Sequence, residues 1–466
     1  MMNLVSLSDE DFNKIEVLFT QFHEQYASFF QNRTKSVAKS AHNYLHGQLF
    51  TQQPMNLIQY CREVPESDYE AMQHFISDSP WDDEKLITQL QQDVYHLIGD
   101  ENDGALILDE SGIPKQGHLS VGVSRQYCGR LGKVDNCQVG VYLAYANPYH
   151  TSLVDYRMYL PEAWVGDDGR RRKCGVPQGI TFLTKAQLGL EMIRAFSASN
   201  LPFRWVCMDA HYGEQPWLLK ALTDERICYM ADIPSDTRIF TDCPHTEIPP
   251  RKGDRGRHPT QEKRVEGTSP PIEVRAFAQS LSETDWTRLS VRETERGWLI
   301  ADFAAFRVWH AVNDLPFAQV WLVLRRPVGE KRAIRYAFSN GPKETPLHQL
   351  ARMQCRRYWV ERALEDAKGE AGLDQYQVRG WRGWHHHMTM TLLAMFFLLQ
   401  LTQRFREKAP LFTLQDAREI LEEFLPRNTY SPKEFIERLK QKHQARLSAR
   451  RSHAKKQKQW LNDTKI

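Results

Sequence analysis

Two aspartates stand where carboxylates can act together on one ligand. Asp109 directly follows the apolar run Ala105–Leu108, and Asp209 directly follows the run Phe203–Met208. Because functional side chains collect at strand ends in α/β domains, these residues are candidates for one site. Two neighbouring carboxylates repel each other unless a cation lies between them, and Mg²⁺ prefers oxygen ligands of this kind. The alternative is that each aspartate only caps the turn or helix that follows it.

A third carboxylate, Glu361, belongs to a segment with a helical pattern. A helix turns by about 100° per residue, which places three further side chains within about 40° of Glu361 around the helix axis: Gln354, Arg357 and Lys368. A carboxylate flanked by two cations on one face suits a metal ligand with phosphate-binding neighbours. The alternative is a ladder of ion pairs on an exposed helix face.

Strands and helices must alternate to position these side chains, and the pattern between residues 104 and 233 predicts that they do. The predicted strands are Ala105–Leu108, Val139–Ala146, Leu153–Leu160, Phe203–Met208 and Ile227–Ile233. One helix is predicted from its cap at Thr184 to about Ser197, and another over Trp217–Thr223. This order is that of an α/β layer domain.

Five parts of the chain differ in pattern. Residues 1–100 are expected to be helical, and residues 101–233 to form the first part of the α/β core. A β-rich insertion is expected over 234–344, with strand-like pieces at Glu273–Ala278, Trp286–Val291, Trp298–Phe303, Phe306–Trp309, Gln319–Arg325 and Ile334–Ser339. Residues 345–405 carry the third carboxylate on core helices. Residues 406–466 contain helices at Leu414–Phe424 and Pro432–Gln441 and a basic tail.

The formal charge of +3 on 466 residues does not by itself indicate a nucleic-acid partner. Locally the charge is less balanced, and partners respond to local fields. Arg438–Gln459 contains nine Lys and Arg with no acid, and Arg251–Arg264 has six against two acids. Arg379, Arg382 and Trp384 add a basic and aromatic cluster. We expect DNA contacts at these places, the alternative for the tail being a disordered, merely solubilising segment.

Other features bear on location and on metal binding. The N-terminus has no secretory signal pattern, and the apolar run Met388–Leu401 is too short to span a bilayer, so it predicts a buried core helix. The eight cysteines are scattered without a CxxC pair, which favours a cytoplasmic protein with reduced thiols. His385–His387 point in different directions around a helix, so DNA contact or plain helix surface is expected there. Glu110 is expected to support its neighbours and His211 to contact DNA or pack locally.

These residues carry a resemblance to a known family. The sequence resembles the DDE transposases of bacterial insertion sequences, most closely the insertion-sequence-701 type. Arg357-x3-Glu361-x6-Lys368 matches the Tyr-x2-Arg-x3-Glu-x6-Lys signature of the broader group, although Gln354 stands where the tyrosine is expected. Matching blocks occur in family order over 106–146, 160–164, 174–177, 206–213 and 367–390. The resemblance runs from about residue 25 to about residue 400.

The resemblance implies a fold and a reaction. It implies an RNase H-like core, interrupted by the insertion, in which Asp109, Asp209 and Glu361 are catalytic and hold two Mg²⁺ ions, with Mn²⁺ able to substitute. The reaction is cleavage of DNA at transposon ends followed by strand transfer into target DNA. The partners are double-stranded DNA, with its terminal inverted repeats, and a second copy of the chain in a homodimer; no membrane is involved. The alternatives are a transposase-derived DNA-binding protein that does not cut, and a metal-dependent nuclease without strand transfer.

Seven further residues are expected at phosphates or DNA. Arg357 and Lys368 would hold phosphates near the cut. Related enzymes that form a hairpin at the transposon end stack a tryptophan of the insertion on a flipped base, and Trp298 is the preferred candidate here. The remaining expected DNA contacts are Lys115, His211, Arg379 and Arg382.

Overall fold

A computed structural model describes residues 5–31, 35–52, 54–250, 258–294, 297–329 and 333–463. From residue 105 onward the structure contains both strands and helices, as the sequence predicts. The strands are β1 (Ala105–Pro114), β2 (Ser124–Cys128), β3 (Lys133–Ala146), β4 (Thr151–Tyr159), β5 (Trp205–Met208), β6 (Cys228–Ile233), β7 (Arg238–Phe240), β8 (Thr246–Glu247), β9 (Lys263–Arg264), β10 (Ile272–Glu273), β11 (Thr287–Thr294), β12 (Gly297–Val312), β13 (Leu315–Pro327) and β14 (Arg335–Ser339).

Twelve of the described strands form one mixed sheet, ordered β10-β7-β12-β13-β14-β6-β5-β1-β3-β2, with β4 paired to β3 and β11 to β12. β1, β3 and β4 are antiparallel, whereas β5 and β6 run parallel to β1. Between them lie α7 (Glu162–Val165), α8 (Asp168–Cys174), α9 (Lys185–Ala198), α10 (Ala210–Gly213) and α11 (Pro216–Asp224). The Thr184 hydroxyl accepts from the Gln187 amide, which confirms the predicted helix start.

The β-rich segment continues the same sheet, because β14 pairs antiparallel with β6. Two predicted strand pieces, Trp298–Phe303 and Phe306–Trp309, form the single strand β12. The prediction of a strand over Glu273–Ala278 was wrong, since α12 (Val274–Gln279) occupies most of it. Val274 and Ala278 are the buried residues of this segment and Ala276 is exposed, whereas a strand would place all three on one face.

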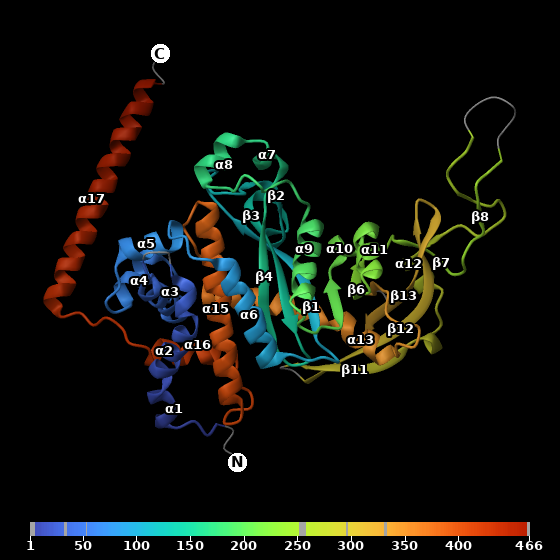
Figure 1. Cartoon of the computed structure of the whole chain (residues 1–466), viewed down its shortest axis with the longest axis horizontal. Coiled ribbons are helices and arrows are strands. Elements are labelled where there is room, and N and C mark those ends of the chain that lie inside the picture. Colours follow the sequence, from blue (N-terminus) through green and yellow to red (C-terminus); the bar gives the residue numbers. More distant parts are fainter. Residues whose placement is uncertain are drawn as a thin grey trace.

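The first hundred residues are helical, as predicted: α1 (Asp9–Asn13), α2 (Ile15–Tyr26), α3 (Ala38–Phe50), α4 (Leu57–Glu63), α5 (Tyr69–Ser77) and α6 (Asp83–Ile98). They pack around α15 (Trp381–Arg406), which touches β4 and α14 (Tyr358–Ala371) as well as α3, α5 and α6. This explains why Met388–Leu401 is apolar all round, and it confirms the predicted core helix. In Figure 1 these helices lie at one end of the molecule and β12 and β13 at the other. No helix of the described ranges is both long and apolar enough to cross a membrane.

Three further helices complete the chain. α13 (Leu347–Arg356) and α14 meet at Arg357, whose backbone is itself in the α-helical region, with φ −55° and ψ −29°. The ion pair of Arg357 with Glu361 has the i,i+4 spacing of a helix. α16 (Leu414–Phe424) has the predicted bounds. α17 (Pro432–Asp463) continues through the basic run, which is therefore helical and not a disordered tail. Figure 1 shows α17 standing apart from the sheet.

Candidate active site

Three aspartates lie in one row across adjacent parallel strands. Asp209 directly follows β5, as predicted, whereas Asp109 lies within β1, which continues to Pro114 and does not end at Leu108, and Asp232 lies within β6. Leu108 of β1 pairs with Met208, and Met208 pairs with Ala231 of β6. The residue after each of these is an aspartate: Asp109, Asp209 and Asp232. The register therefore brings the two predicted site residues, Asp109 and Asp209, together with Asp232, which the sequence analysis placed within the predicted strand Ile227–Ile233. The signal for Asp232 was present, since it is the charged residue in an otherwise apolar strand.

Burial and mutual repulsion make the row electrostatically unfavourable. Burial, followed by the charge of Asp209, raises the pKa of Asp109 to about 7. Burial and the charge of Glu110 raise the pKa of Asp209, and burial raises that of Asp232. Asp209 also caps α10 by accepting hydrogen bonds from the amides of His211, at 3.0 Å, and Tyr212, at 3.4 Å. The capping alternative therefore holds for Asp209 in addition to its place in the row.

Arg357 joins the third predicted carboxylate to this row. Its guanidinium lies 2.6 Å from Glu361 Oε1, 3.2 Å from Asp232 Oδ2 and 3.6 Å from Asp109 Oδ2. The charges of Glu361 and then of the aspartates raise the pKa of Arg357 against the opposing effect of burial. The pair with Glu361 is the i,i+4 ion pair that the alternative reading of this helix expects. Glu361 is the most exposed of the group, with a side chain 48% accessible.

Glu110 supports the row from the opposite face of β1. Its carboxylate accepts from Lys185 Nζ of α9 at 2.5 Å and from Tyr212 Oη of α10 at 2.9 Å. α10 lies close to β6, and glycine at position 213 permits this approach. A Cβ atom there would collide with the carbonyl oxygen of Asp232. Neither Lys185 nor Tyr212 was found from the sequence, because their contacts with Glu110 join residues 75 and 102 positions apart in the chain.

Lys368 lines a groove beside the carboxylates. The groove has a volume of about 450 Å³ and is bordered by Glu110, Ser111, Gly112, Gly129, Arg130, Glu365 and Lys368. Burial and the charge of Arg130 lower the pKa of Lys368, and the charge of Asp109 acts in the opposite direction. Lys368 is thus near enough to Asp109 to sense its charge, as expected for a residue that would hold a phosphate at the site.

Of the remaining predicted DNA contacts, His211 adjoins the row of aspartates through its backbone amide. Lys115 Nζ stacks on the ring of Tyr376, 3.6 Å from its centroid, and burial lowers its pKa to about 8. His211 is exposed on α10, Arg379 is exposed before α15, and Arg382 donates to the carbonyl of Asp78 at 2.7 Å. Trp298 is 60% exposed on β12, so it is not a core tryptophan. Among the described residues, no hydrogen bond or ion pair connects Arg379, Arg382 or Trp298 with the carboxylates.

One prediction about nearby residues was wrong. His385–His387 do not form a helix surface that meets DNA, because His386 and His387 are buried and all three bond to protein groups. Gln354 is buried on α13 and donates to the carbonyl of Val323 at 3.4 Å.

The donor set fits a divalent cation in chemical kind, since it consists of carboxylate oxygens, and burial together with the charge of Asp209 raises the pKa of Asp109. Within the part of the chain that the structure describes, no three His, Cys, Asp or Glu residues are grouped closely enough to hold one ion. Arg357 lies between Asp109 and Glu361 and supplies the positive charge there. The pair Asp109 and Asp209 is therefore the part of the site that attracts a cation most directly.

Comparison with known proteins assigns this chain, with its row of aspartates across the central strands, to a family. The sequence profile of the DDE superfamily endonuclease family matches residues 18–297. This is more than half of the chain, so the chain belongs to that family, which implies an RNase H-like core. The matched part contains Asp109, Asp209 and Asp232.

A relative of the chain has a name that points the same way. It is described as a probable transposase for insertion sequence element IS701, from Microchaete diplosiphon. It is 25% identical over 367 residues, which cover 77% of this chain and 82% of the relative. The resemblance found in the sequence blocks is confirmed.

Proposed function

We propose that this chain is a DDE transposase that cleaves DNA at the ends of a mobile element and transfers the freed strands to target DNA. The observation that carries this proposal is the row of aspartates across β1, β5 and β6, with Glu361 joined to it through Arg357. Burial raises the pKa of all three aspartates. Carboxylates perturbed in this way cost stability, and such groups cluster at functional sites. The family and the IS701 relative supply the reaction class.

Asp109, Asp209 and Glu361 would hold the two Mg²⁺ ions, with Mn²⁺ able to substitute. When bound, such ions polarise the phosphodiester and favour ionisation of the attacking water or hydroxyl. Glu361 is available as a ligand once its ion pair with Arg357 opens, and its exposure leaves room for that movement. Arg357 would then be free to turn from the carboxylates toward a phosphate.

The reaction needs two phosphoryl transfers. In the first, water attacks the phosphodiester at the element end, the bond from phosphorus to the 3′ oxygen breaks, and a 3′ hydroxyl is released. In the second, this hydroxyl attacks a target phosphodiester, and one phosphorus–oxygen bond replaces another. Arg357 and Lys368 would neutralise the charge that develops on the phosphate oxygens, so the protein contributes position and electrostatics and forms no covalent bond.

DNA contacts outside the cleft remain part of the proposal. Lys115, His211, Arg379 and Arg382 would contact the DNA backbone near the cut. Trp298 would stack on a base displaced from the duplex. Residues 1–100 and the basic helix α17 would bind the terminal repeats, and two copies of the chain would hold the two ends together. The five-part division at residues 100, 233, 344 and 405 is the domain organisation that we propose.

The test is cleavage by the full chain of duplex DNA that carries the ends flanking its own gene. With Mg²⁺ or Mn²⁺ we expect nicking and joining, and none in EDTA. Asp109→Asn, Asp209→Asn and Glu361→Gln should each lower the cleavage rate by at least about 10²-fold while end binding persists. Asp224→Asn is the matched control, because Asp224 is exposed on α11 and paired with Lys220.

The outcomes separate the three candidate functions. Cleavage without joining would assign a nuclease, and binding without cleavage would assign a transposase-derived DNA-binding protein. Cleavage that survives Asp109→Asn would refute the assignment of Asp109 as a ligand.

A further inference from the structure

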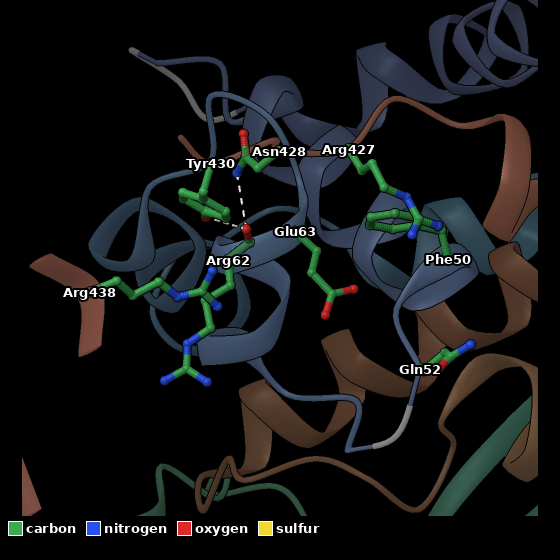
Figure 2. A pocket seen from close by; sticks show the side chains of 8 residues that line it. All are labelled: Phe50, Gln52, Arg62, Glu63, Arg427, Asn428, Tyr430 and Arg438. Atoms are coloured by element: carbon green, nitrogen blue, oxygen red, sulfur yellow. Dashed lines mark hydrogen bonds between the residues drawn. The ribbon is translucent and has the colours of Figure 1, made fainter. Parts of the chain in front are cut away.

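A second hollow lies far from the carboxylates, where the N-terminal helices meet the segment between α16 and α17. Its volume is about 350 Å³. Figure 2 shows Arg62 and Arg438 on one flank and Arg427 against Phe50 on the other, with Glu63 between them. Three arginines therefore surround one carboxylate, so the hollow carries a net positive charge.

The backbone of this hollow is fixed by hydrogen bonds. Asn428 Nδ2 donates to the carbonyl oxygens of Arg62 at 3.2 Å and Val64 at 3.0 Å, and the Asn428 amide donates to the carbonyl of Glu63 at 2.7 Å. Tyr430 Oη donates to the same Arg62 carbonyl at 2.5 Å. Figure 2 shows the bonds from the side chains of Asn428 and Tyr430 meeting at the Arg62 carbonyl. The segment before α17 is thus tied to the end of α4.

The start of α17 is fixed in the same way. The Ser431 amide donates to the Glu434 carboxylate at 2.8 Å, and the Glu434 amide donates to the Ser431 hydroxyl at 3.3 Å, which is a capping box. Two turns later, the Arg438 guanidinium lies 4.6 Å from the ring centroid of Tyr430. Its Nε is buried without a hydrogen-bond partner. A buried donor of this kind is costly unless a ligand supplies an acceptor.

The arginines of the hollow have no ion-pair partner among the described residues. Within the same residues, Arg62 donates to the side chain of Gln59, at 3.3 Å, and Arg427 to the carbonyl of Glu422. The charge of Arg62, and less so that of Arg438, lowers the pKa of Lys442 on α17. Lys442 therefore lies near the hollow, although the first turns of α17 also carry Glu434 and Glu437.

We propose that this hollow binds a backbone phosphate of double-stranded DNA and that α17 follows the same backbone beyond it. The inference rests on the proposed function, which supplies DNA as the partner. Guanidinium groups match the geometry of phosphate oxygens, and the phosphate would give Arg438 the acceptor that it lacks. The hollow is built from residues 50–63 and 427–438, so it joins the N-terminal helices and the C-terminal helix in one DNA-binding surface.

The test is DNA binding by the full chain in EDTA, so that cleavage does not interfere. The probes are a duplex with the ends flanking its own gene and an unrelated duplex of equal length, each titrated at several salt concentrations. Each lost phosphate contact should make the negative slope of log K against log salt shallower by about 0.9. We expect this change for Arg62→Gln and for Arg438→Gln, with similar losses on both duplexes because phosphate contacts do not read sequence.

Two further variants sharpen the test. Glu63→Gln removes the negative charge of the hollow and should strengthen binding, which is the opposite sign. Arg194→Gln is the matched control, since Arg194 is exposed on α9 and paired with Glu225. The Arg62 substitution leaves the carbonyl that holds Asn428 and Tyr430 intact, and unchanged thermal unfolding would show that the variants fold.

The outcomes are distinguishable. Pocket variants that bind both duplexes as tightly as Arg194→Gln overturn the inference while leaving the proposed function untouched, provided that the wild type binds and cleaves ends. A wild type that binds no DNA contradicts the proposed function itself. Inorganic phosphate at matched ionic strength is the third probe. If it binds and is lost in Arg438→Gln while DNA binding is unchanged, the hollow takes a free anion and the DNA assignment is refuted.

Discussion

Arg357 Nε donates to the carboxylate of Asp232 at 3.2 Å, although the two residues lie 125 positions apart in the chain. Asp232 belongs to the central strand β6, whereas Arg357 lies at the junction of α13 and α14. This contact fixes where the guanidinium sits between Asp109 and Glu361. The strand thus positions a residue of the helix that carries the third predicted acid.

We predict that Asp232→Asn mainly impairs catalysis. The substitution removes the charge that holds Arg357, so we expect a roughly tenfold lower rate of end cleavage with little change in DNA affinity. Asp232→Glu keeps the charge and should recover part of the rate. Cleavage kinetics and thermal unfolding are measured together. If the rate and the melting temperature fall in parallel and Asp232→Glu recovers neither, the positioning role is refuted.

We predict that Asp109→Asn stabilises the metal-free protein at alkaline pH. The pKa of Asp109 is raised to about 7, above the value of about 3.9 in an unfolded chain. The folded state then binds more protons than the unfolded state between about pH 4 and pH 7, so the free energy of unfolding falls as the pH rises through this range. The destabilisation is complete at pH 8 and absent near pH 4.

Urea unfolding in EDTA checks this prediction. Asp109→Asn should raise the free energy of unfolding by roughly 2–4 kcal/mol at pH 8 and change it little at pH 4. Added Mg²⁺ should stabilise the wild type more at pH 8 than at pH 5, because protons compete with the metal for carboxylates. An equal effect of the substitution at both pH values would contradict the prediction.

We predict that His387 makes the fold sensitive to acid. Its Nε2 faces the carbonyl of Gly372 at 3.1 Å and must donate, so its Nδ1 accepts from Tyr44 Oη at 2.7 Å in the neutral ring. Burial lowers its pKa to about 4, below the unfolded value of about 6.5. Stability is therefore present at neutral pH and is lost as the pH falls from about 6.5 toward 4.

His387→Gln should lower the free energy of unfolding at pH 7. Between pH 7 and pH 4.5, however, this free energy should fall by roughly 1–3 kcal/mol less in the variant than in the wild type. Guanidinium unfolding at the two pH values measures this difference. His443→Gln, at an exposed histidine of α17, is the control and should follow the wild type. A wild-type acid response that persists in His387→Gln would show that other groups cause it.

We predict that Trp298 acts on DNA and not on folding. Its side chain is 60% exposed, so Trp298→Ala should change the free energy of unfolding by less than about 0.5 kcal/mol. Loss of stacking on a base costs about 1–3 kcal/mol, which corresponds to a roughly 5- to 150-fold slower end reaction. Trp321→Ala is the contrast, because Trp321 Nε1 donates to the Pro342 carbonyl at 3.0 Å and its loss should destabilise the fold. Normal end processing by Trp298→Ala would rule out the stacking role.

Most of the fold follows from local patterns. The helix after Thr184 begins with a capping box, and β1, β3, β4, β5 and β6 overlap the predicted strands. The errors are physical as well. α12 has six residues, which is too short for its period to be distinguished from that of a strand in the sequence. The burial of His386 depends on Trp81, which lies between α5 and α6 and stacks on it at 3.9 Å between ring centroids.

The sequence by itself determined which acids follow the apolar runs, which basic residues flank Glu361, and which family the blocks resemble. Only the tertiary structure decided that Asp109 and Asp209 stand side by side, because strand register depends on pairing between distant segments. That register adds Asp232 to the row beside Asp109 and Asp209. The tertiary structure also decided that the central cation is Arg357, since ion pairs across 125 and 248 positions depend on how a helix packs against a sheet and not on spacing along the chain.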